Sequence, residues 1–440
     1  MCCFAQNPID VRGSSFPALK IIGLIKIKTF AQTPLQNRSI PFGWVGGLLV
    51  FVLGIVECAT DIYLPSLPTL VSEFKTTEES IGLTISAYFL SFCLMGPIYG
   101  PLSDALGRRY ILIAGIALFS VFSFFCAFAT SVPQLIIYRV LQGMGASVAW
   151  VVGLAIVKDV YTGKDRINML SLMGTMVAVS PGIAPILGGY ITTLWGWRPV
   201  FWVVGIFSTL SVILLIWHLD ETHPPAKRQK LQFKVAIHNY KRLLQTFQFY
   251  GYALISALMY SGIMIYVVIS PFYYIEYLGI STEVFGCTQA ALILAYMLGT
   301  YVNRRAIHHW KSRWLLGFGL LSALAGAIIF SIFTLLFPKF PALLTASMAL
   351  YSFGAGVVFS NTSNYALEAL PEAGGASAAL LGVFEMTLVA FGVWLAGILY
   401  VHCLFPISLC ILVCVLLSLF LLVRLEKKTK DPLSPMQAPN

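Results

Sequence analysis

Charged side chains are scarce in this sequence. Asp, Glu, Lys and Arg make up 10% of the 440 residues, whereas 58% of the residues are hydrophobic. A soluble protein of this length cannot keep so apolar a surface in water, so the composition excludes a globular soluble domain and predicts a protein with lipid around its outer faces. The formal net charge of +10 does not indicate a nucleic-acid partner, because the basic residues lie between apolar runs rather than on one face.

Paired cysteines, nucleotide-binding loops and metal-ligand clusters are also missing. The nine cysteines are an odd number, most of them lie inside apolar runs, and their spacing fits neither a disulfide framework nor a zinc site. We expect the buried ones to pack as small apolar residues, and only the adjacent Cys2 and Cys3 suggest acylation as an alternative. The sequence therefore predicts no cofactor, no metal and no enzyme activity.

Twelve apolar runs each approach the ~20 residues that a helix needs to cross a bilayer. They are expected at residues 42–63, 80–101, 109–130, 133–157, 169–194, 199–219, 248–274, 282–303, 314–337, 341–365, 375–401 and 403–424. Because a polar, basic stretch separates the sixth run from the seventh, we expect an all-α membrane protein with twelve transmembrane helices in two six-helix bundles that are pseudo-repeats.

The segment boundaries follow from these runs. We expect the two bundles at residues 42–219 and 248–425, a cytoplasmic linker loop at 220–247 and a cytoplasmic tail at 426–440. Residues 1–41 carry five basic residues and one acidic residue, which predicts a basic tail at the inner membrane surface. An upstream extension without function, from a misplaced start codon, is the alternative for this segment.

Positive charge predicts the orientation. With both termini inside, 24 of the 28 Lys and Arg residues fall on the inner side and three on the outer side, while Arg139 lies within a run. Lys and Arg are enriched in cytoplasmic loops, so we expect a multi-pass protein of the cell inner membrane with both termini in the cytoplasm.

Four charged side chains lie well inside the apolar runs: Glu57, Asp61, Arg139 and Glu385. Each costs at least ~2.5–3.5 kcal/mol at the bilayer centre, so such residues persist where they pair with one another or face water or substrate. Glu57 and Asp61 are four residues apart and share one face of the first helix. Counted along the runs, Arg139 lies at a similar depth, which predicts an ion-paired cluster if the first and fourth helices are neighbours.

These four residues can couple transport to protons. Arg keeps its proton at working pH, whereas carboxyl groups release theirs. A carboxyl group that alternates between a buried, unpaired setting and a wet or paired one can load and release a proton. Glu385 is a second candidate carrier or a cation-binding group. The alternative for each residue is a static structural role, as an ion pair or as a hydrogen bond between helices.

Several segments of the chain resemble motifs of the major facilitator superfamily. The signature loop between spans two and three of that family resembles this chain's segment Gly100-Pro-Leu-Ser-Asp104-Ala-Leu-Gly107-Arg108-Arg109. The fourth-span motif of the family resembles this chain's segment Arg139-Val-Leu-Gln142-Gly143-Met-Gly145-Ala146. Its fifth-span antiporter motif resembles the segment from Gly174 to Gly189. The twelve-span drug:proton antiporters, and most closely their bicyclomycin-resistance-like branch, resemble this chain in Thr60-Asp61-Ile-Tyr63-Leu64-Pro65 and in Gly196-Trp197-Arg198-Pro-Val-Phe201.

The resemblance implies alternating-access export driven by inward proton flow. In the family, the arginine that matches Arg139 is implicated in proton coupling, and the first-span acid in proton or substrate handling. The resemblance implies a gating loop that clamps the bundles together, here Gly100, Asp104, Gly107, Arg108 and Arg109. It implies an antiporter motif that limits leak, here Pro181, Gly182, Pro185, Gly188 and Gly189. The chain departs from the family in its Ala184-Pro185 and in Glu57, an extra acid that suggests cationic or polar substrates.

We therefore expect a monomeric proton-coupled efflux transporter in the lipid bilayer that exports small, partly apolar, drug-like molecules. A dedicated exporter of a secreted metabolite, such as a siderophore, amino acid or small peptide, is an alternative. A non-coupled facilitator or a transporter-like sensor is a second one. We expect the substrate cavity to be lined by Trp150, Tyr260, Tyr266 and Asn361, where apolar area and few polar contacts suit loose specificity.

Overall fold

The computed structural model describes residues 42–228, 233–370 and 374–429, and the expected N-terminal tail at 1–41 lies outside them. In this part of the chain the regular elements are all helices, and twelve of them are long and apolar enough to cross a membrane. Residues Gly43–Asn440 belong to one compact unit. The twelve spans confirm the all-α membrane fold.

The helices of the first bundle come first in the chain. They are α2 (Phe42–Asp61), α3 (Leu67–Phe74), α4 (Glu78–Leu106), α5 (Arg108–Ala127), α6 (Val132–Val160), α7 (Gly163–Trp195) and α8 (Arg198–His218). One span comprises α2, the short 3₁₀ turn η2 (Leu64–Ser66) and α3. Pro65 and Pro68 stand in the first turns of η2 and α3, where a missing N–H costs nothing, so the chain restarts helically after the break.

The second bundle follows the linker. Its helices are α10 (Phe247–Pro271), α11 (Thr282–Ala306), α12 (Ser312–Leu336), α13 (Pro341–Glu368), α14 (Gly374–Leu399) and α15 (Phe405–Thr429). A π-helical turn, η4 (Phe272–Tyr277), continues α10 after Pro271. The linker, which we expected to be a loop, contains the helix α9 (Phe233–Gln245), which packs against α10 and α14.

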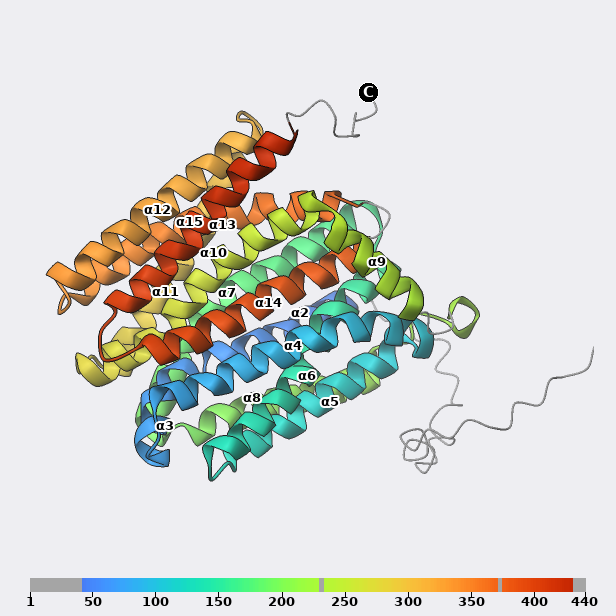
Figure 1. Cartoon of the computed structure of the whole chain (residues 1–440). Coiled ribbons are helices and arrows are strands. Elements are labelled where there is room, and N and C mark those ends of the chain that lie inside the picture. Colours follow the sequence, from blue (N-terminus) through green and yellow to red (C-terminus); the bar gives the residue numbers. More distant parts are fainter. Residues whose placement is uncertain (1–41, 229–232, 371–373, 430–440) are drawn as a thin grey trace, which may run out of the picture. The chain divides into compact units, whose positions relative to one another are not determined.

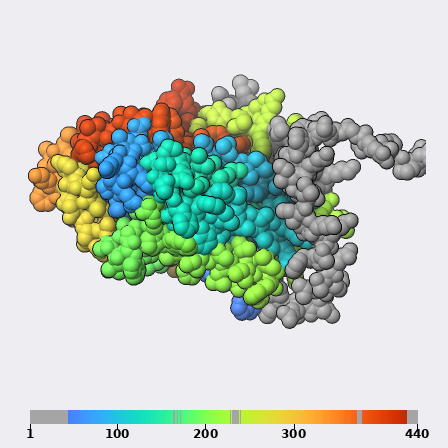
Figure 2. Space-filling view, turned by 90° about the horizontal axis from the view of Figure 1, so that it is seen from below, coloured from blue at the N-terminus to red at the C-terminus, as the bar shows by residue number. Residues whose placement is uncertain are grey.

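The two bundles repeat one packing pattern. In the first, α4 packs on α6, α5 on α6, and α5 on α8; the matching pairs in the second are α11 on α13, α12 on α13, and α12 on α15. The bundles meet through α4 with α14 and through the equivalent pair α11 with α7. In Figure 1, α5, α6 and α8 lie on one side and α12, α13 and α15 on the other. In Figure 2 the teal and green helices of the first bundle fill the middle and lower part of the view.

Small residues allow the closest helix contacts. A Cβ atom added to Gly145 of α6 would lie 2.5 Å from the backbone nitrogen of Phe119 in α5. In the second bundle, a Cβ atom on Gly326 of α12 would lie 2.5 Å from the backbone nitrogen of Tyr351 in α13. Backbones that approach this closely leave no room for a side chain, as is common between membrane helices. The glycines therefore fix the same pair of helices in both bundles.

We predict that Gly145→Ala lowers the midpoint of thermal unfolding of the purified protein. The added methyl group must displace the α5 backbone, an overpacking that costs ~1–3 kcal/mol. Gly317→Ala in α12 is the matched control, because a Cβ atom there has no neighbour within 4 Å. The control gains helix propensity, so its midpoint stays level or rises. Equal shifts in both variants would contradict the packing argument.

Candidate proton and substrate site

Two carboxyl groups lie one turn apart at the end of α2. Asp61 is the last residue of this helix and is 7% exposed, while Glu57 is half-buried. Between them, the Cys58 thiol lies 2.8 Å from the Ser180 hydroxyl of α7, which fixes the rotation of α2 against that helix. Asp61 is thus buried within the protein, and Glu57 is partly so.

Arg139 of α6 is completely buried, but it is not paired with these acids. Its Nη1 donates a hydrogen bond to Gln142 Oε1 at 2.7 Å, and its Nε and Nη2 have no hydrogen-bond partner. Aromatic rings surround the guanidinium instead, with its Cζ 4.3 Å from the ring centre of Tyr88 and 5.1 Å from that of Tyr63. The expected ion pair is therefore absent in this structure, and cation–π contacts take its place.

Tyr88 of α4 stands between the cation and the carboxyl groups. The Arg139 guanidinium lies over the ring of Tyr88. The hydroxyl of Tyr88 forms a hydrogen bond with the Thr60 side chain of α2 and interacts electrostatically with Glu57 and Asp61. The face of the Tyr88 ring contacts the arginine, and its hydroxyl contacts the helix that carries the acids. Tyr88 therefore links Arg139 to α2 without an ion pair. Tyr88 thus interacts both with Arg139 and with the two acids.

Glu385 of α14 lies on the second bundle at the boundary with this group. It is 8% exposed, and its Oε1 accepts a hydrogen bond from the Ser256 hydroxyl of α10 at 2.7 Å. Tyr260, one turn further along α10, lies in the electrostatic range of Glu385, Glu57 and Asp61. Carboxyl groups from both bundles therefore converge on one tyrosine.

The structure separates the other residues that we expected to line the cavity. Tyr266 is fully buried within the second bundle, where its hydroxyl lies 2.9 Å from that of Tyr274. Asn361 of α13 donates a hydrogen bond to Asn303 Oδ1 of α11 at 2.7 Å and so joins two helices of one bundle. Trp150 is half-buried and packs against the core. Tyr260, the fourth of these residues, interacts electrostatically with Glu57, Asp61 and Glu385.

The segment predicted to be a gating loop is mostly helical. α4 continues through Gly100 and Asp104 to Leu106, and α5 begins at Arg108, so the connection is the single residue Gly107. Gly107 has φ +106°, a conformation that residues with a Cβ rarely adopt. The sharp turn that the sequence indicated is thus real but far shorter than expected.

Arg108 organises this end of the first bundle. Its guanidinium is 2.5 Å from Asp104 and 3.2 Å from Asp159, at the end of α6. The backbone N–H of Arg108, the first residue of α5, donates to Glu221 Oε1 at 2.9 Å. A carboxylate at a helix N-terminus is favoured by the helix dipole. Arg109 instead donates to the backbone oxygen of Ile216 in α8 at 2.6 Å.

The fifth-span motif lies where α7 meets α11. α7 stays helical through Pro181 and Pro185. A Cβ atom on Gly189 would lie 2.7 Å from the backbone oxygen of Thr282, and one on Gly182 would lie 3.5 Å from Ile293. Gly188 abuts the backbone oxygen of Ile62, beyond the end of α2. This glycine row therefore brings α7 against the second bundle and against the acid-bearing helix.

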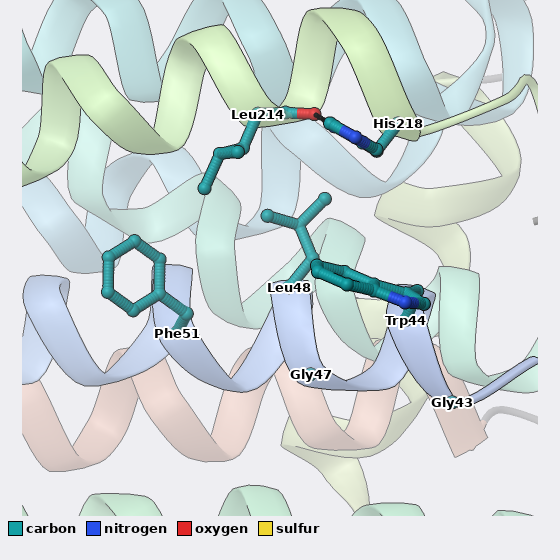
Figure 3. A pocket seen from close by; sticks show the side chains of 7 residues that line it. All are labelled: Gly43, Trp44, Gly47, Leu48, Phe51, Leu214 and His218. Atoms are coloured by element: carbon teal, nitrogen blue, oxygen red, sulfur yellow. Dashed lines mark hydrogen bonds between the residues drawn. The ribbon is translucent and has the colours of Figure 1, made fainter. Parts of the chain in front are cut away.

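A surface pocket between α2 and α8 lies away from these groups. Trp44 and His218 stack across it, with ring centres 6.0 Å apart, and Gly47, Phe51 and Leu214 line it further along (Figure 3). At 1.5 Å per residue, Gly47 is about 15 Å along the helix from Glu57. We therefore place the candidate site at the buried charges and not in this apolar pocket.

Sequence reasoning missed three sets of groups. The rings around Arg139 come from Tyr63, Tyr88 and Phe201, two of which stand in the quoted motifs but were not given a role. Ser256 carries no signal apart from its apolar surroundings. Glu221, in the linker, could have been noticed as an acid directly after a span, although nothing in the sequence points it towards Gly107.

Twelve crossing helices in two matching bundles, with charged side chains buried where the bundles meet, define a membrane transport protein. The chain belongs to the Major Facilitator Superfamily, whose family model matches residues 49–378 and 252–439. It is therefore a multi-pass membrane transporter of small molecules.

Named relatives and solved structures agree with this family. The chain is 32% identical over 358 residues to the uncharacterized MFS-type transporter YdgK of Bacillus subtilis, covering 80% of this chain and 88% of that one. It is 27% identical to the multidrug resistance protein MdtL of Shewanella oneidensis, covering 88% and 95%. A bacterial homolog of the human lysosomal transporter Spinster shares the fold, with a TM-score of 0.71, 17% identity and coverage of 91% and 100%. The xylose transporter XylE of E. coli does so with a TM-score of 0.68, 13% identity and coverage of 90% and 99%.

We predict that Glu221→Gln destabilises the first bundle. The neutral amide loses the charged hydrogen bond to the first N–H of α5 and the ion pair with Arg228, whose Nη2 is 3.5 Å from the carboxylate. The expected loss is about 1–2 kcal/mol, seen as a lower midpoint of thermal unfolding. Asp220→Asn is the matched control, since Asp220 is an exposed neighbour. A shift of the same size in the control would show that net charge alone is responsible.

Proposed function

We propose that this transporter exports small, partly apolar, drug-like molecules in exchange for inward-moving protons. It does so by alternating access, as a monomer in the cell inner membrane, with both termini in the cytoplasm. The name of the MdtL relative, a multidrug resistance protein, supports a drug-like substrate class. The excess of Lys and Arg on one side of the predicted topology supports the orientation.

The observation that carries this proposal is the pair of carboxyl groups set within the protein beside an unpaired guanidinium. Asp61 and Glu57 lie one turn apart, and Tyr88, whose ring faces the Arg139 guanidinium, interacts electrostatically with both acids. An arginine keeps its charge throughout, so the groups that can change charge in this neighbourhood are the acids. A carboxyl group between two solvent-exposed states, with a fixed cation near it, can take up a proton on one side and release it on the other.

Rocking of the bundles provides the two states. The bundles meet along α4 with α14 and along α7 with α11, and small residues let these helices slide. Cys93 of α4 lies 3.5 Å from Thr387 of α14, near the level of Glu385. In this mechanism, water reaches the acids from one side at a time. Protonation of Glu57 and Asp61 accompanies one orientation, and substrate binding near Tyr260 accompanies the other.

Proton exchange can be measured in everted membrane vesicles that contain the protein. Respiration acidifies the vesicle lumen, and a substrate of a proton-coupled exporter then enters while protons leave, which a pH-sensitive dye reports. We expect discharge with members of a panel of antibiotics, siderophores and amino acids. Arg139→Ala should insert in the membrane yet show no discharge. If no compound in a broad panel discharges the gradient in the wild type, proton-coupled export is refuted. Discharge by one metabolite alone would favour the dedicated exporter.

Variants of the two acids can distinguish the coupling of transport to protons from the movement of substrate itself. We predict that Asp61→Asn and Glu57→Gln still exchange labelled substrate for unlabelled substrate across vesicles without a pH gradient. The same variants fail to concentrate substrate when a gradient is imposed, because an amide carries no titratable proton. Export by the wild type should rise with the gradient, and export by the double variant should not respond to it. Wild-type accumulation in the double variant would remove both acids from the mechanism.

A further inference from the structure

A basic turn at one end of the second bundle has no part in the proton mechanism. It runs from Arg304 to Trp314, joins α11 to α12, and contains four Lys and Arg residues, two histidines and no acid. The side chains of Arg304, Arg305 and Lys311 are exposed, and none of the three forms an ion pair with another described residue. The turn is therefore a surface patch whose positive charge no acid of the described chain neutralises by direct contact.

The equivalent turn of the first bundle holds its basic side chains within the protein. There Arg108 forms two ion pairs, and Arg109 donates a hydrogen bond to a backbone oxygen of α8. Of the four basic residues in the second turn, Arg313 is held in a similar way, by two hydrogen bonds of 2.5 Å to the carboxylate of Glu426. The other three differ from their counterparts in the first bundle, because their charged groups face outwards.

Local geometry makes this patch suited to a phosphate group. The helix α12 begins after Lys311 with no side-chain cap and with no acid in its first turn. The unbonded N–H groups and the dipole of such a helix start favour an anion. The Cζ atom of Arg305 lies 5.3 Å from the ring centre of Tyr301, a contact that orients its guanidinium. The planar N–H donors of arginine match two phosphate oxygens at once.

Aromatic side chains indicate that the phosphate belongs to a membrane lipid. Trp310 and Trp314 are 58% and 70% exposed, and both helices that flank the turn are long and apolar enough to cross a membrane. Tryptophan rings gather at the level of the lipid headgroups, and basic residues next to a span attract anionic lipids. A soluble acidic partner would use the charges but would leave the exposed rings without a role.

We propose that Arg304, Arg305 and Lys311 bind the headgroup phosphate of an anionic phospholipid, beside the rings of Trp310 and Trp314. The bound lipid holds the turn between α11 and α12 at the headgroup layer. The equivalent turn of the first bundle, whose basic groups are engaged within the protein, has no such site. This lipid site lies apart from the buried acids and does not depend on proton coupling.

The test is a lipid titration of the purified full-length protein in detergent, followed by native mass spectrometry. The probes are phosphatidylglycerol, which is anionic, and phosphatidylcholine with the same acyl chains, which has no net charge. We expect the wild type to bind phosphatidylglycerol about tenfold more tightly, and the double variant Arg304→Gln with Arg305→Gln to prefer it only about twofold. Lys311→Gln alone should lower the preference to about fourfold.

The matched control is Lys158→Gln with Lys241→Gln, which removes the same charge from exposed lysines of α6 and α9 and should keep the wild-type preference. Equal losses in the two double variants would show that net charge alone attracts the lipid and would overturn the site. Glycerol phosphate, the soluble part of the headgroup, should not displace bound phosphatidylglycerol at equal concentration. Displacement by it would assign the patch to a soluble phosphate, and displacement by an acidic peptide would assign it to a protein; either result overturns the proposal.

Discussion

Every part of this site depends on keeping an arginine charged in the interior of a membrane protein. Removing a guanidinium from water is costly, and a carboxylate partner is the usual compensation. Here Arg139 has one side-chain hydrogen bond, to Gln142, and the faces of aromatic rings. Because its charge is balanced only loosely, the nearby acids are not locked into an ion pair. That freedom is what a carboxyl group needs if it is to change its protonation state during a transport cycle.

The duplicated architecture divides these charged residues between its two bundles. The acid-bearing α2 and the arginine-bearing α6 belong to the first bundle, and Glu385 belongs to the second. Contacts between the bundles pass through backbone at Gly189 and Gly286, where side chains would not fit. Backbone contacts of this kind have no interlocked side chains to separate, which suits the relative motion of the bundles that the proposed export mechanism requires.

The sequence predicted the positions of the helices better than the lengths of the connections between them. It predicted which charged residues lie within the spans better than which residues they contact. Twelve apolar runs led directly to twelve spans, because length and hydropathy alone decide what crosses a bilayer. The connection between the second and third spans was expected at residues 102–108, since Pro101 looks like a breaker, yet membrane helices tolerate proline and α4 continues to Leu106. Counting residues along the helices predicted that Arg139 lies at the same depth as the acids. The rotation of α6 about its axis is set by packing, and this rotation decides whether Arg139 forms a salt bridge or contacts aromatic rings. Packing likewise decides that Tyr266 and Asn361 make hydrogen bonds within the second bundle, to Tyr274 and Asn303.

The helices α4 and α11 occupy equivalent places in the two bundles but differ near their C-terminal ends. Asp104 and Asn303 both stand four residues after a glycine, at Gly100 and Gly299. The Asp104 side chain is 48% exposed where it meets Arg108, whereas Asn303 and Asn361 bond as neutral amides and are 5% and 2% exposed. Dissolved ions screen exposed charges and leave buried amides untouched. Ionic strength therefore weakens the contact between Asp104 and Arg108 in the first bundle but not the amide contact between Asn303 and Asn361 in the second, so the two equivalent positions respond differently to the medium.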